Sequence, residues 1–122
     1  MNKPENIIKE IEALMVDKHF NDALKLIEVN SNEVSKKEYY YLKSVLCRYL
    51  NHTNEALLCL DKLIQLDPSY GRAFQEFGHN FIKTDPKKSL KAYLRAVRHN
   101  PSLQASWLGI LSIERENTVL ID

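Results

Sequence analysis

The sequence contains few of the residues that build phosphate-binding loops, disulfide frameworks or zinc sites. Its three glycines, Gly71, Gly78 and Gly109, are too scattered to form a loop that cradles a phosphate. Its two cysteines, Cys47 and Cys59, are too few for a disulfide framework and lack the paired spacing of a zinc site. We therefore interpret both cysteines as reduced, buried small hydrophobic residues, and we expect neither a cofactor nor a metal.

The chain also lacks an excess of one charge and a long apolar run. Seventeen basic and sixteen acidic residues give a formal net charge of +1, so no overall field attracts nucleic acid or an anionic membrane. The apolar part of the N-terminal segment is interrupted by Lys9, Glu10 and Glu12, which excludes a secretory signal or a membrane span there. We expect a cytoplasmic protein that binds neither nucleic acid nor membrane.

The histidines do not form a catalytic or metal-binding motif. None of His19, His52, His79 and His99 lies four residues from another histidine or a cysteine. His79 has Glu76 one helical turn away, but a solvated pair at this spacing is far commoner than a general base. We predict that the protein is not an enzyme and has no catalytic residue.

The sequence is rich in residues that favour helices. Leu, Lys, Glu, Ala and Ile are abundant, proline occurs four times, and 44% of the residues are hydrophobic. At 122 residues the chain has the length of one ordinary domain, and we expect a single domain over residues 1–122.

A period of 33 or 34 residues runs through the sequence. A spacing of 33 separates Pro68 from Pro101, and it also relates Ala23, Ala56 and Ser89. A spacing of 34 relates Tyr40, Ser44 and Cys47 to Phe74, Gly78 and Phe81. Such a period is typical of stacked helical hairpins. The mixture of 33 and 34 predicts that the inner turn of the third hairpin is one residue shorter than that of the second.

Turn signals divide the repeat into helices. The predicted helices cover about 4–17, 21–30, 36–50, 54–66, 70–83, 86–99 and 103–117. They pair into hairpins at about 4–30, 36–67 and 70–100, and the helix at about 103–117 is left unpaired. Ser35 with Glu38 has the pattern of a capping box, and Asp85 before Pro86 suits a helix start. Asn21, Thr53 and Ser102 are further candidate N-caps.

The segment 72–101 resembles the tetratricopeptide repeat (TPR) family. It supplies, in the family's order, Phe74, Phe77, Gly78, Phe81, Ser89, Tyr93, Ala96 and Pro101. Gly78 and Ser89 lack bulk, so two helices are expected to approach closely there. The resemblance implies an all-α, right-handed α-solenoid of about three TPR hairpins. The first hairpin is a degenerate copy, with Ile11 at the close-approach position.

The last predicted helix begins like a fourth repeat. Trp107 stands 33 residues after Phe74, and Leu111 falls where a close-approach glycine would be. The helix is either a cap on the third hairpin or the start of a repeat that is cut short.

Two stretches resemble one TPR subfamily more closely. The segments YGRAFQEFGH and NPSLQASW, residues 70–79 and 100–107, are similar to the N-terminal repeats of bacterial TPR-containing sulfotransferases. In that family a separate C-terminal domain binds the sulfuryl donor through a Gly/Ser-rich loop, and this sequence has no such loop. The resemblance therefore implies a docking or regulatory repeat module, or a stand-alone relative, and no activity of its own.

The resemblance to TPR proteins also predicts a concave groove lined by the first helix of each hairpin. Side chains one, five and eight residues past each packing aromatic residue would face it, and three others would flank them. These candidates for binding a peptide or a neighbouring domain are Tyr41, Val45, Arg48, Gln75, His79, Ile82, Leu108, Ser112 and Arg115, flanked by Tyr49, Arg72 and Glu76.

Two further expectations concern aromatic and apolar side chains. In the run Tyr39, Tyr40 and Tyr41 at least one ring should belong to the core, and Tyr40 is the expected one. If the last helix is unpaired, Trp107, Leu108 and Leu111 could instead bury themselves against a second copy in a homodimer.

Overall fold

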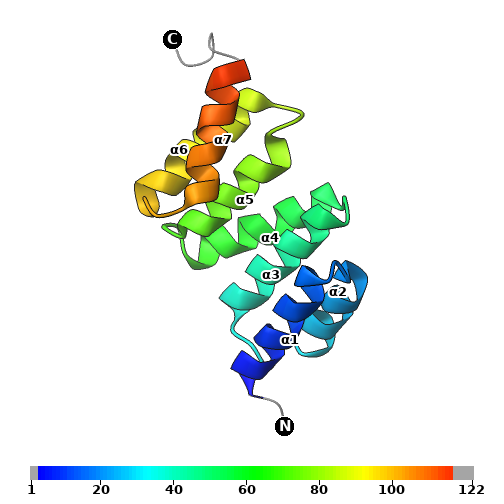
Figure 1. The fold of residues 1–122 in the computed structure, drawn as a ribbon. Helices are drawn as coiled ribbons and strands as arrows, with labels where there is room; N and C mark the ends of the chain where they lie inside the picture. The colour runs from blue at the N-terminus through cyan, green and yellow to red at the C-terminus, as the bar shows by residue number, and fades with distance from the viewer. Residues whose placement is uncertain (1–2, 117–122) are drawn as a thin grey trace. The chain divides into compact units, whose positions relative to one another are not determined.

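A computed structural model describes residues 3–116, and within them the fold is all-α, with no strand. The seven helices of this part of the chain are α1 (Pro4–Val16), α2 (Phe20–Val29), α3 (Lys36–Tyr49), α4 (Thr53–Leu66), α5 (Gly71–Phe81), α6 (Pro86–His99) and α7 (Gln104–Glu116). Figure 1 shows them along the chain. The all-α prediction is confirmed, and the predicted end of the last helix at 117 lies outside the described residues.

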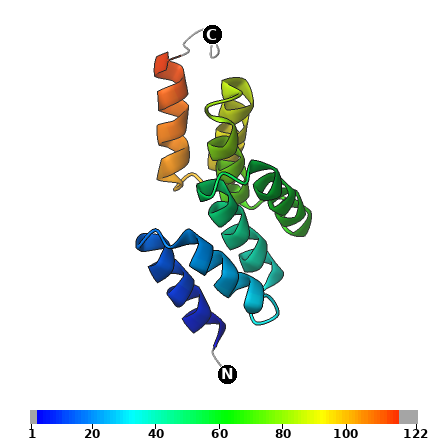
Figure 2. The ribbon, with the colours of Figure 1, turned by 90° about the vertical axis from the view of Figure 1, so that its right-hand side faces the viewer.

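The helices belong to two compact units, Met1–Leu66 and Asp67–Asp122. In the first unit α1 packs against α2, α2 against α3, and α3 against α4. In the second unit α5 packs against α6, and α7 packs against both (Figures 1 and 2). The expectation of one domain over residues 1–122 stays a prediction, and each unit is described by itself.

The first unit has its own apolar core. Its fully buried side chains come from all of the first three helices, and they include Ile7, Ile11, Ala23, Ile27 and Leu46. Tyr39 and Tyr41 pack against this core, and Tyr40 does not. Tyr39 and Tyr40 both line a surface groove between α3 and α4. The expectation that Tyr40 is the core tyrosine is wrong, because Tyr39 shares the inward helical face with Leu42 and Leu46.

The inner turns of the first two hairpins share one geometry. Lys18 and Asn51 adopt left-handed φ values of 62° and 63°. Beside them the His19 and His52 amides donate to carbonyl groups five residues earlier, each at 2.8 Å. These two features define a Schellman ending of the helix.

The inner turn of the third hairpin is closed by a different hydrogen bond. There the Asp85 amide donates to the Phe81 carbonyl, four residues earlier, at 2.8 Å, and the turn contains no left-handed residue. The closing hydrogen bond thus spans one residue fewer than in the first two hairpins. However, four residues (82–85) separate α5 from α6 and only three (50–52) separate α3 from α4, so the connection between the helices is not shorter, contrary to the prediction.

Helix starts follow the predicted caps only in part. The side chains of Ser35 and Asp85 accept hydrogen bonds from the Glu38 and Lys88 amides, as predicted. Asn21 is not an N-cap, because α2 already begins at Phe20 and the Schellman turn places His19 at the cap.

The remaining two candidates fail for related reasons. Thr53 is already the first residue of α4, and the carbonyl of His52 before it accepts from the Ala56 amide. Ser102 lies two residues before Gln104, where α7 begins, and its amide and hydroxyl both donate to Asn100 Oδ1. Neither is the N-cap that was predicted.

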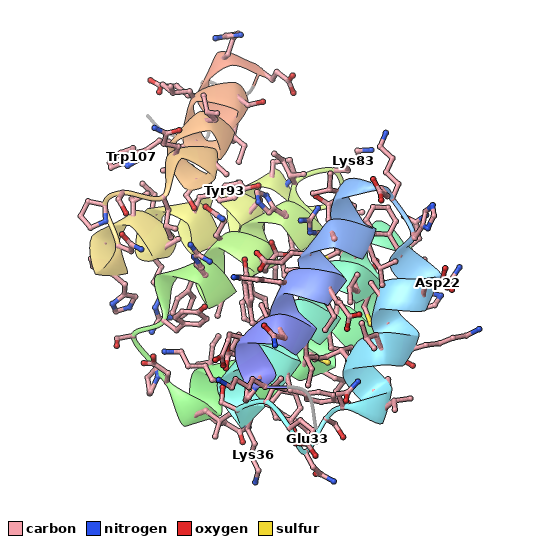
Figure 3. The ribbon with its side chains drawn as sticks, turned by 60° about the horizontal axis from the view of Figure 1, so that its bottom comes forward. Asp22, Glu33, Lys36, Lys83, Tyr93 and Trp107 are labelled. Carbon is pink, nitrogen blue, oxygen red and sulfur yellow. The ribbon has the colours of Figure 1, made fainter. Side chains whose placement is uncertain are left out.

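The second unit is built around the ring of Tyr93. A Cβ added to Gly78 on α5 would lie 2.4 Å from Tyr93 Cε1, and one added to Gly109 on α7 would lie 2.4 Å from Cε2. Ser89 on α6 donates its hydroxyl to the Gly78 carbonyl at 2.8 Å. The predicted close approach at Gly78 and Ser89 is therefore confirmed, and the two glycines leave room for one aromatic ring among three helices. Figure 3 labels Tyr93.

Candidate peptide-binding residues

The candidates on α3 differ widely in exposure. Val45 is buried and Tyr41 is half-buried against the core of the first unit. Tyr49 is exposed, and its ring stacks on Phe20 with a centroid distance of 4.7 Å and an interplanar angle of 2°. The Arg48 guanidinium carbon lies 4.6 Å from the centroid of the Tyr49 ring. Arg48 and Tyr49 thus present an ordered surface, whereas Val45 contributes to the interior.

Two polar candidates on α5 are held in place by neighbouring helices. Gln75 and His79 are one helical turn apart, and both are half-buried. The Ser106 hydroxyl on α7 donates to Gln75 Oε1 at 2.8 Å. The Tyr93 hydroxyl on α6 and His79 Nδ1 form a hydrogen bond of 2.6 Å. The second unit therefore fixes the orientation of both side chains.

The two flanking candidates on α5 lie in different surroundings. Arg72 is exposed, whereas Glu76 is only 3% exposed. Because so little of the Glu76 side chain reaches the surface, it is poorly placed to contact a ligand directly. The half-buried Ile82, after the end of α5, packs against the core of the second unit and is likewise a structural residue.

The candidates on α7 include large exposed apolar side chains. Leu108 is 66% exposed, Leu111 is 52% exposed, and Trp107 is 45% exposed. Figure 3 labels Trp107 on this helix. Trp107 Nε1 donates to the Pro101 carbonyl at 2.8 Å, which fixes the indole. Arg115 is exposed and Ser112 is half-buried.

The close-approach position on α7 is Gly109 and not Leu111. Leu111 faces outward, whereas Gly109 lies against the Tyr93 ring. The repeat spacing from Phe74 to Trp107 predicted the wrong position, because it assumes that α7 packs against a second helix of its own hairpin. Within the described residues α7 packs against α6 and α5 instead. The isolated glycine inside a helical pattern was the available signal.

The remaining side chains offer little chemistry. Cys47 and Cys59 are both free and buried, and burial raises the pKa of the Cys47 thiol to about 11. A thiol of this kind is a poor nucleophile at neutral pH. Residues 3–116 contain no group of three or more His, Cys, Asp or Glu side chains that could hold a metal ion. No helix in that range is both long and apolar enough to cross a membrane.

In comparisons with known proteins, no protein-family model and no curated protein matches this chain.

Proposed function

We propose that this protein is a non-catalytic interaction scaffold of the TPR type, a right-handed α-solenoid whose first helices hold a peptide or a neighbouring domain. The close packing of α5 and α6 at Gly78 and Ser89 supports the TPR interpretation, because these are the positions where the family resemblance requires small residues. The residues that we propose for binding are Arg48 and Tyr49 in the first unit and Arg72, Gln75 and His79 in the second.

The observation that carries this proposal is the fixed orientation of Gln75 and His79. Polar side chains on a surface normally lose rotamer freedom when they bind a ligand, and that loss weakens binding. Here Ser106 and Tyr93 already restrict the two side chains before any ligand arrives. The Ser106 bond uses only the oxygen of the Gln75 amide, so the amide nitrogen of Gln75 can donate to a peptide carbonyl.

Selection from a random peptide library displayed on phage tests the proposal. We expect peptides selected on the wild-type chain to bind the Gln75→Ala variant about tenfold more weakly, which corresponds to about 1.4 kcal/mol. Ser106→Ala removes the restraint on Gln75 without removing a contact with the peptide, so it should weaken binding only a few-fold. The control is Arg98→Ala, an exposed change on α6.

Fluorescence polarisation measures the affinities, and circular dichroism verifies that each variant remains helical. Equal affinity for wild type and Gln75→Ala would contradict the proposed binding surface, as would failure to select any peptide.

The second candidate function is self-association through α7. It is favoured by the exposure of Trp107, Leu108 and Leu111, since large apolar side chains gathered on one helix are typical of interaction sites. A homodimer should appear in sedimentation equilibrium and should be lost in the Leu108→Lys, Leu111→Lys double variant. A wild-type chain that remains monomeric at high concentration would rule this candidate out.

The resemblance to sulfotransferase repeats gives a third candidate, a docking or regulatory module. Under this proposal the partner is a separate catalytic domain. Copurification of this chain with a sulfotransferase domain is the corresponding test.

A further inference from the structure

A groove that the sequence analysis did not anticipate runs between α5 and α6 on the surface of the second unit. Its lining residues are Phe74, Phe77 and Phe81 from α5 and Lys88, Lys91, Ala92 and Arg95 from α6, and we call it the basic–aromatic groove. The hollow along it is open to solvent and has a volume of about 180 Å³. The two helices that form it lie side by side in Figure 1. None of these seven side chains belongs to the surface proposed above.

Cations of α6 cover two of the rings in the groove. Lys88 Nζ lies 5.1 Å from the centroid of the Phe81 ring, and the Arg95 guanidinium carbon lies 4.7 Å from that of Phe74. Both distances are within the range of about 6 Å at which a cation is attracted to the face of an aromatic ring. The rings therefore hold Lys88 and Arg95 along the side of the groove.

The charge of the groove is uniformly positive. The helix α6 contains Lys87, Lys88, Lys91, Arg95 and Arg98 and no acidic residue. No acidic side chain lines the groove, and among the described residues none is within ion-pair distance of Lys88, Lys91 or Arg95. A ligand with carboxylates would thus meet three cations whose charge is not already neutralised at short range.

We propose that the basic–aromatic groove binds an acidic peptide segment, with one aliphatic or aromatic side chain of the segment packed against the half-buried Phe77 and the part of Phe81 that Lys88 leaves uncovered. The hollow is smaller than the roughly 300–1,000 Å³ of sites for drug-sized ligands, so it suits a single side chain better than a cofactor. Glu or Asp residues on either side of that anchor would pair with Lys88, Lys91 and Arg95. This inference does not depend on the surface around Gln75 and His79.

The same geometry disfavours single-stranded nucleic acid as the occupant. Bases bind to such proteins by stacking on open aromatic faces. In this groove Arg95 and Lys88 lie over the faces of Phe74 and Phe81, and Phe74 is only 5% exposed. The near-neutral net charge of the chain also supplies little attraction for a phosphate backbone.

The corresponding groove between α3 and α4 differs in charge, so we expect acidic peptides to prefer the groove of the second unit. There Lys62 Nζ lies 5.6 Å from the centroid of the Tyr40 ring, which repeats the pairing of Arg95 with Phe74 one period earlier. However, Glu55 occupies the position equivalent to Lys88 and lines that groove. Lys43, which also lines it, forms an ion pair with Glu28 at 3.0 Å.

A panel of labelled synthetic peptides tests the proposal on the full chain. Each peptide has a central Leu or Phe, flanked on both sides by Glu, by Gln or by Lys, and a single-stranded oligothymidine serves as the nucleic-acid probe. We expect the Glu-flanked peptides to bind at least about tenfold more tightly than the Gln-flanked ones, and the difference to shrink as salt screens the charges.

Two charge-reversed double variants of α6 locate the binding. Lys88→Glu with Arg95→Glu changes the groove and should abolish the preference for Glu-flanked peptides. Lys87→Glu with Arg98→Glu makes the same change in net charge on the same helix but outside the groove, and should preserve that preference. Lys88→Gln with Arg95→Gln replaces the first variant if circular dichroism shows that it is misfolded.

Three results would overturn the proposal. One is an equal loss of affinity in the groove variant and the control variant, which would indicate non-specific attraction by α6. Another is the absence of any preference for Glu-flanked peptides in the wild-type chain. The third is tight binding of the oligothymidine that the groove variant loses, which would assign the groove to nucleic acid.

Discussion

At the scale of single residues, Tyr93 contacts both structural positions and a candidate binding residue of the second unit. Its ring contacts Gly78 on one edge and Gly109 on the other, and its hydroxyl bonds to the candidate binding residue His79. One buried aromatic side chain thereby sets the spacing of three helices and the orientation of a surface histidine. The cost of adding even one methyl group at either glycine follows from this geometry.

Gly78→Ala should destabilise the protein through its contact with Tyr93. The new Cβ would lie 2.4 Å from a ring carbon, which is too short for any side-chain rearrangement at Tyr93 to relieve cheaply. Overpacking of this kind typically costs about 1–3 kcal/mol. The free energy of unfolding, measured by chemical denaturation with circular dichroism, gives the value.

The matched control for this prediction is the same substitution in a Tyr93→Ala background. Without the ring, Gly78→Ala should be neutral or stabilising by up to about 1 kcal/mol, because alanine favours a helix more than glycine does. If Gly78→Ala is equally destabilising in both backgrounds, the ring contact is not the cause.

At the scale of elements, the three inner turns form a natural comparison. The first two contain a left-handed residue, Lys18 or Asn51. The third contains none, and its closing hydrogen bond spans one residue fewer. A left-handed conformation costs about 1–2 kcal/mol for most residues, but asparagine tolerates it better than lysine. The strain is therefore greatest at Lys18.

Lys18→Gly should stabilise the protein by about 0.5–1 kcal/mol, because glycine adopts a positive φ without strain. Asn51→Gly should have a smaller effect. In the third turn Thr84 has no positive φ, so Thr84→Gly should destabilise through the added freedom of the unfolded chain. Thermal unfolding of the three variants checks this order, and a destabilised Lys18→Gly variant would show that the lysine side chain, and not its backbone, matters.

Elements were the most predictable part of this protein. The repeat spacing and the caps at Ser35 and Asp85 placed the helices to within a few residues, because these signals are local. Positions that depend on a neighbouring helix were harder. Two predictions of this kind were wrong: Tyr40 was expected in the core in place of Tyr39, and Leu111 at the close approach in place of Gly109. Both depend on which face of a helix turns inward, and packing against neighbouring helices decides that.

The candidate site was predicted less well than the helices. The sequence indicated Gln75 and His79 but not the hydrogen bonds from Ser106 and Tyr93 that orient them, since those partners are far away along the chain. It also gave no indication of the basic–aromatic groove. That groove depends on how the aromatic face of α5 meets the cationic face of α6, and each face taken alone resembles an ordinary amphipathic helix.

At the scale of the whole molecule, both thiols belong to one of the two compact units. Cys47 and Cys59 are buried in Met1–Leu66, and no cysteine occurs in Asp67–Asp122. Burial raises the pKa of Cys47 from its ordinary 9.0 to about 11. The rate at which the thiols react therefore measures the unfolding of the first unit alone.

We expect residues 1–66, produced as a separate fragment, to be helical and to protect both thiols from a disulfide reagent at pH 8. The reason is that the core from Ile7 to Leu46 is complete within this segment, although a domain of this size is marginally stable. Rapid reaction of both thiols, at the rate seen in denaturant, would show that the first unit does not fold by itself.

The stability of this fragment should also fall as the pH rises from about 9 to about 11. Over that window the Cys47 thiol ionises in the unfolded chain but stays protonated in the folded one, so the unfolded state binds fewer protons. The Cys47→Ala variant provides the comparison, and its alkaline loss of stability should be smaller. An identical loss in both proteins would exclude this thiol as the cause.

The placement of Tyr93 between two glycines also governs how its ring can rotate. A half-turn of the ring about the Cβ–Cγ bond sweeps both edges through the space beside Gly78 and Gly109, where no room is left in the packed unit. Such a flip requires α5, α6 and α7 to separate briefly. The two sides of this ring should therefore give separate magnetic resonance signals, and the rate at which they exchange measures the breathing of the second unit.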